Sequence, residues 1–103
     1  MIIKTNKLPP IHPGEILLEE FLKPLDLSMN QLAIELRVPA SRINAIVEGE
    51  RSISADTALR LGHYFGMSPE FWINLQATYD LRVARREFEE QIQRDIRPRK
   101  SAA

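Results

Sequence analysis

Residues 28–53 read SMNQLAIELRVPASRINAIVEGERSI. Ser28 is a favourable N-cap residue, and the apolar positions after it recur at helical spacing, which predicts a short helix over residues 28–36. After a tight turn, a second helix is expected over residues 39–48, and Gly49 is of the type that commonly ends a helix. Two short helices joined by so short a turn predict a helix-turn-helix, a motif whose second helix usually lies in the major groove of DNA.

The segments around this motif predict three further helices and no β-strand. One begins near Pro13 and ends or kinks at Pro24, and another begins after the N-cap residue Ser54 and ends at Gly66. The last is expected over residues 69–92, after a Ser-Pro-Glu start signal. The core positions expected in the first and fourth helices are Ile16, Leu17, Leu18, Phe21, Leu22, Leu25, Ala58, Leu59, Leu61 and Phe65. The expected fold is therefore all-α, with five helices and a long helix at the C-terminus.

The length of 103 residues suits one domain with a modest core. Three prolines within the first 13 residues keep an N-terminal arm, residues 1–12, extended. The domain itself is expected over residues 13–96, and residues 97–103 have the composition of a flexible basic tail.

Composition narrows the class of protein. The chain has no cysteine, which excludes disulfides and cysteine-based zinc sites and fits a reducing cytoplasm. No apolar run approaches the roughly 18 residues that span a bilayer, and the N-terminus lacks the apolar core of a secretory signal. We therefore expect a cytoplasmic protein without a membrane partner. The formal net charge is +0, which argues against nonspecific coating of DNA but permits a local basic surface.

The outward face of the second helix of the motif suits contact with base edges. Short side chains let a helix lie deep in the groove, and Asn pairs well with adenine and Arg with guanine. The expected base-reading residues are Ala40, Ser41, Arg42, Asn44 and Ala45. Phosphate contacts are expected from three places in the motif: the start of its first helix, the turn, and the loop after its second helix. The residues are Ser28, Met29, Gln31, Arg37, Arg51 and Ser52. The alternative is an ordinary helical hairpin with a solvated polar face.

The last predicted helix is apolar on two nearly opposite sides. One side carries Trp72, Leu75, Tyr79 and Val83, and the other carries Ala77, Leu81, Ala84, Phe88 and Ile92. Such a helix needs two partners, of which one is its own core and the other a second chain. At 1.5 Å per residue, about 24 residues make roughly 36 Å, longer than a compact domain of this size covers. We expect the distal half to project, with an interface to a second chain, such as a dimer mate, at Leu81, Ala84, Phe88 and Ile92. The alternative is a helix folded back along its own domain.

Several motifs follow one another from position 12 to position 81. They are HPGEIL (12–17), EEFLKPLDLS (19–28), QLA (31–33), VPASRI (38–43), IVEGERSIS (46–54), DTALRL (56–61), FGMSPEFWINLQ (65–76) and YDL (79–81). With these motifs the chain resembles the HigA-type antitoxins of the Xre, or lambda-repressor-like, group, also called virulence-associated protein I. The run SPEFWINLQ followed by YDL is the part most specific to the antitoxin branch. The resemblance implies a lambda-repressor-like homodimer that binds double-stranded operator DNA, represses its own operon and neutralises a RelE-like toxin that cleaves mRNA.

The chain departs from the family pattern at three turn positions. Asp26 and Arg37 stand where relatives usually carry glycine. If either residue is left-handed, the conformation costs about 1 kcal/mol, and less for Asp. Pro39 replaces the serine that often caps the second helix of the motif, so that helix is expected to begin without a side-chain cap.

The same sequence features also permit other functions. One is a stand-alone Xre regulator without a toxin partner. Another is a protein-interaction module that no longer binds DNA, because Glu48 and Glu50 oppose the few bases near the second helix. An enzyme is not expected, since there is no nucleophile with a base, no recognisable carboxylate pair and no metal cluster, and no cofactor is implied. His12 with Glu15 comes nearest to a metal or acid–base site, but it lacks a recognisable ligand spacing.

Overall fold

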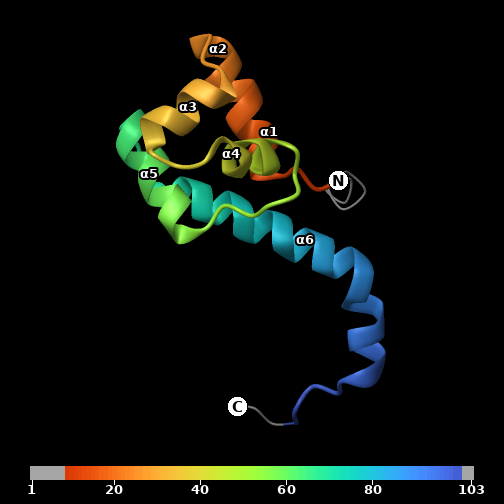
Figure 1. The fold of residues 1–103 in the computed structure, drawn as a ribbon. Coiled ribbons are helices and arrows are strands. Elements are labelled where there is room, and N and C mark those ends of the chain that lie inside the picture. The colour runs from red at the N-terminus through yellow and green to blue at the C-terminus, as the bar shows by residue number, and fades with distance from the viewer. Residues whose placement is uncertain (1–8, 101–103) are drawn as a thin grey trace.

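The structure is a computed structural model that describes residues 9–100. Its elements are α1 (Pro13–Ile16), the π-helical segment η2 (Leu17–Leu22), α2 (Lys23–Leu25), α3 (Met29–Leu36), α4 (Ala40–Val47), α5 (Ala55–Phe65) and α6 (Pro69–Asp95) (Figure 1). Because α1, η2 and α2 follow one another without a break, they form one helix. The five predicted helices are therefore all present, residues 9–100 contain no strand, and the all-α expectation is confirmed. Most of the predicted arm and the end of the predicted tail lie outside the described residues.

The first helix contains a wide turn that the sequence did not predict. Over Leu17–Leu22 the backbone is π-helical, and at its end the Lys23 N–H donates to the carbonyl of Leu18. Pro24 has no N–H, and its ring needs space beside the carbonyl four residues earlier, which a wider turn provides. The helix therefore continues past Pro24 and ends where Asp26 adopts a left-handed conformation with φ 53°.

The core lies where the first helix, α3, α4, α5 and the start of α6 meet. Its buried apolar side chains are Leu17, Leu22, Leu32, Ala33, Leu36, Ile43, Ile46, Ile53, Ala58, Leu61 and Trp72. The Trp72 ring is fully buried and lies 5.1 Å from the Phe21 ring, centroid to centroid. Two core predictions were wrong, because Leu25 is 58% exposed and Leu59 is 63% exposed. Leu25 lies in the last turn before the chain reverses, and Leu59 lies on the outer face of α5.

The start of the first helix packs very closely against the end of α4. A Cβ atom at Gly14 would lie 1.8 Å from the carbonyl oxygen of Ile46 and 2.9 Å from the Cα atom of Val47. Only a residue without a side chain permits this approach. Pro13 and Gly14 are both buried by it. This close contact holds the end of α4 against the start of the first helix.

Helix α6 has two halves with different surroundings. Its first half packs against α5 and α1 and buries Trp72 and Gln76. Its second half extends away from the other helices (Figure 1), and the molecule measures 53 × 27 × 24 Å. On that half Leu81, Phe88 and Ile92 are each about half exposed. The predicted projection is thus confirmed, although the helix ends at Asp95 rather than near residue 92. Among residues 9–100 no helix is long and apolar enough to span a membrane.

Candidate nucleic-acid interface

The connection between α3 and α4 is a tight turn built without glycine. Ser28 caps α3, and its Oγ accepts a hydrogen bond from the Gln31 N–H at 3.0 Å. At the other end of α3, Arg37 is left-handed with φ 61°. Pro39 gives α4, which begins at Ala40, no side-chain cap. The expected cap at Ser28 and the expected uncapped start of α4 are confirmed, and the structure shows that Arg37 adopts the left-handed conformation.

Helix α4 packs with one face in the core and leaves the opposite face outward. Ile43 and Ile46 are fully buried. Since an α-helix turns once in 3.6 residues, Ser41, Asn44 and Ala45 lie opposite these two side chains. Ser41 is exposed, and Asn44 and Ala45 are partly exposed. We call Ser41, Asn44 and Ala45 the reading face; its role in base contact remains a prediction.

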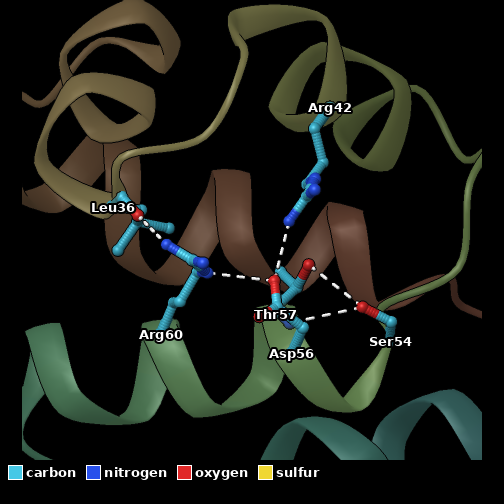
Figure 2. Close-up of polar contacts among 6 residues, drawn as sticks. All are labelled: Leu36, Arg42, Ser54, Asp56, Thr57 and Arg60. Carbon is cyan, nitrogen blue, oxygen red and sulfur yellow. Dashed lines mark hydrogen bonds and ion pairs between the residues drawn. The ribbon is translucent and has the colours of Figure 1, made fainter.

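Arg42 lies beside the reading face and is bound to α5. Its Nη1 donates to Oδ2 of Asp56 at 2.9 Å, and Arg60 Nε donates to the same oxygen at 2.9 Å. Arg60 Nη1 in turn donates to the carbonyl of Leu36 at 2.7 Å (Figure 2). The hydrogen bonds from Arg60 and then from Arg42 hold the pKa of Asp56 below its ordinary value. The predicted base-reading role of Arg42 therefore stays a prediction, and its guanidinium is already engaged.

Ser54 determines where Asp56 stands. Its Oγ accepts a hydrogen bond from the Thr57 N–H at 3.3 Å and so caps α5, as the sequence predicted (Figure 2). This cap places Asp56 in the first turn of α5, where the helix dipole favours a negative charge. The same position brings the carboxylate within reach of α4.

The residues predicted to contact phosphates surround the motif. Five of them are exposed, namely Ser28, Gln31, Arg37, Arg51 and Ser52. Met29 is partly buried and packs against the core, which limits it to a contact through its backbone. Within residues 9–100 neither Arg37 nor Arg51 forms an ion pair, so both guanidinium groups are available to an anion.

Comparison with known proteins places this arrangement in a family. A helix-turn-helix family profile matches residues 18–72. Virulence-associated protein I of Dichelobacter nodosus is 57% identical over 79 residues, which are 77% of this chain and 73% of that protein. An addiction module antidote protein of the HigA family from Coxiella burnetii is 49% identical, with a TM-score of 0.85 over 89% of this chain and 100% of that one. The chain belongs to the HigA branch of the helix-turn-helix family. The Pseudomonas aeruginosa antitoxin HigA, solved with the higBA promoter, is 50% identical, with a TM-score of 0.85 over 86% of this chain and 97% of that one.

In this HigA-type domain a side chain of α6 forms a hydrogen bond with the loop between α4 and α5. The Ile53 N–H donates to Oε1 of Gln76 at 2.8 Å, and Gln76 Nε2 donates to Oδ1 of Asp80 at 2.9 Å. Gln76 is only 6% exposed, so its amide is committed to these two bonds. The loop that carries Arg51 and Ser52 is therefore anchored to the long helix.

His12 has a structural role at the start of the first helix. Its Nδ1 accepts a hydrogen bond from the Gly14 N–H at 2.9 Å, and its ring meets the Tyr79 ring edge-on at 4.8 Å. Burial lowers the pKa of His12, against smaller opposite effects of Asp80 and of the Arg51 backbone. The Nδ1 lone pair thus accepts a backbone hydrogen bond at the start of the first helix. Among residues 9–100 no three residues of the His, Cys, Asp and Glu types lie close enough together to hold a metal ion.

Sequence reasoning missed three residues that build this interface: Gly14, Asp56 as a partner of Arg42, and Gln76. The pair of Asp56 with Arg60 has the i, i+4 spacing that marks helical ion pairs, and this spacing could have revealed it. No local pattern joins Arg42 to Asp56 or Ile53 to Gln76, because these partners are 14 and 23 residues apart in the chain.

Proposed function

We propose that this HigA-family chain is an antitoxin that binds double-stranded operator DNA through α4 and represses its own operon. The observation that carries the proposal is the reading face, where short polar side chains project from a helix whose opposite face is locked in the core. The promoter complex of the Pseudomonas aeruginosa relative supports the same use of the fold.

The chemistry of the reading face suits direct contact with bases. The Asn44 amide can donate to and accept from adenine at once, and the Ser41 hydroxyl can do either. Ala45, and Ala40 at the start of the helix, allow close approach to the groove and contact thymine methyl groups. Arg37 and Arg51, which form no ion pair within residues 9–100, flank the motif and would bind phosphates. The start of α3 at Ser28, Met29 and Gln31, and Ser52 in the loop after α4, would add further phosphate contacts.

The exposed half of α6 supports the partner proposals. Its apolar face, formed by Leu81, Ala84, Phe88 and Ile92, would pair with a second copy or with the toxin. A homodimer would place two copies of α4 about 34 Å apart in successive major grooves. A RelE-like toxin encoded by a neighbouring gene is the proposed second partner, and co-purification of that gene product tests it. If no such gene product co-purifies, the result would favour a stand-alone regulator without a toxin partner.

The experiment for DNA reading compares the gene's own upstream region with a scrambled duplex. Asn44→Ala is expected to lower discrimination between them by about 1–3 kcal/mol, because a bidentate base contact is lost. Asn74→Ala is the matched control, since Asn74 is an exposed asparagine on α6 and should leave binding unchanged. Both are measured by fluorescence anisotropy at fixed salt. Equal discrimination by Asn44→Ala and the wild type would contradict base reading by α4.

A further inference from the structure

Two side chains of α5 hold both ends of the helix-turn-helix turn. The Asp56 carboxylate binds Arg42 in the first turn of α4, and the Arg60 guanidinium binds the carbonyl of Leu36, the last residue of α3. Asp56 and Arg60 also bind each other, so the contacts are continuous from α3 through α5 to α4 (Figure 2). The cluster is not on the reading face, and the proposed function makes no use of it.

The cluster restrains Arg42 in particular. Its side chain is 23% exposed, and its buried Nε has no hydrogen-bond partner among residues 9–100, so the guanidinium is packed on one edge and paired on the other. Asp56 is ionised at neutral pH, as an exposed aspartate ordinarily is, and its hydrogen bonds to Arg60 and Arg42 lower its pKa further. Figure 2 shows Arg42 directed from α4 towards α5. The positive charge nearest the reading face is thus compensated by Asp56.

An unpaired arginine at this place would act differently. A free guanidinium binds any phosphate and any exposed guanine edge. Phosphate contacts carry no sequence information, so they raise affinity for every duplex alike. The side chain of Arg42 is 23% exposed, and within residues 9–100 Asp56 is its one ion-pair partner, so Asp56 is the group that directs Arg42 towards α5.

We propose that Asp56 is a positioning residue for specificity: it keeps Arg42 paired with α5, so that Ser41 and Asn44 read the bases and Arg42 contacts no DNA. This inference rests on the proposed DNA binding and deepens it. It also replaces the guanine contact expected for Arg42 from the sequence with a role in which the guanidinium is withheld.

The test is Asp56→Asn, which retains the shape of the side chain but removes its charge. Binding to operator and scrambled duplexes is measured between 50 and 200 mM salt. We expect severalfold tighter binding to the scrambled duplex and a log–log salt dependence steeper by about one per protomer, because the freed Arg42 gains a phosphate. Glu50→Gln is the matched control, because Glu50 is an exposed acid in the loop after α4 and has no ion pair within residues 9–100.

The double variant Asp56→Asn/Arg42→Met tests whether the effect of Asp56→Asn requires Arg42, while Glu50→Gln, which changes the net charge by the same amount as Asp56→Asn, measures a general charge effect. If Asp56 acts through Arg42, the double variant returns to the wild-type salt dependence. A salt dependence that stays steep in the double variant, or that is equally steep in Glu50→Gln, would overturn the proposal.

Arg42→Met alone keeps the proposal testable if Asp56→Asn does not fold, which circular dichroism would show. We expect the wild-type salt dependence in Arg42→Met, and a decrease of about one per protomer would mean that Arg42 already contacts phosphate. Failure of the proposed function is a separate result, namely a wild-type protein that does not prefer the operator. A wild type that prefers it, with Asp56→Asn equal to Glu50→Gln, contradicts only the role of Asp56.

Discussion

Gly14 is the residue on which the packing of the first helix against α4 depends most directly. Gly14→Ala would bring a methyl group to 1.8 Å from the Ile46 carbonyl, which is backbone and cannot rotate away. We expect the free energy of unfolding to fall by at least about 3 kcal/mol, the upper range for overpacking. Urea unfolding followed by circular dichroism measures it.

A second glycine provides the comparison for this prediction. Gly66 is left-handed with φ 68°, and a Cβ atom there would meet nothing within 4 Å. Gly66→Ala should therefore cost only the backbone strain, about 1 kcal/mol. Similar losses for the two alanine variants would show that the helices can move apart at Gly14.

At the scale of the element, α3 and α4 begin in different ways. The start of α3 is stabilised by the Ser28 hydroxyl, whereas α4 begins after Pro39 with no side-chain cap. Ser28→Ala is expected to lower the free energy of unfolding by about 1 kcal/mol, because the Gln31 N–H loses its partner. Thermal unfolding at fixed pH and salt checks it.

Ser41→Ala is the matched control for the cap, because Ser41 is exposed inside α4 and no hydrogen bond of its side chain occurs within residues 9–100. Its stability should stay within about 0.5 kcal/mol of the wild type. If Ser41→Ala destabilised the protein as much as Ser28→Ala does, the assignment of the cap would be wrong.

The elements also show what the sequence could and could not predict. The starts of α3 and α5 were predictable, because Ser28 and Ser54 bond to N–H groups three residues away. The π-helical turn before Pro24 was not, since its width depends on how a whole helix accommodates one ring. The reading face followed from helical periodicity, but the pairing of Arg42 with Asp56 needed the arrangement of α4 against α5.

At the scale of the whole molecule, the exposed half of α6 is available for self-association. Phe88 is 49% exposed on the apolar face that also carries Leu81 and Ile92. We expect Phe88→Ala to shift a dimer towards monomer, because large aromatic side chains dominate interface energetics. Multi-angle light scattering over a range of protein concentrations measures the shift.

Tyr64→Ala is the control for self-association, since Tyr64 is an aromatic residue that is 39% exposed but belongs to α5 and not to the apolar face of α6. It should leave the molar mass unchanged. A Phe88→Ala protein with the wild-type molar mass at every concentration would exclude this face as the dimer interface.

The division of α6 into a packed half and a projecting half bears on how such a chain can evolve. Trp72 and Gln76 lie in the half that the fold requires, and substitutions there are penalised through stability. Beyond Leu81 most side chains are exposed, and exposed positions usually tolerate substitution within about 0.5 kcal/mol. Selection can therefore diversify the distal half, and with it the surface that we propose as an interface, while the packed half of the helix stays unchanged.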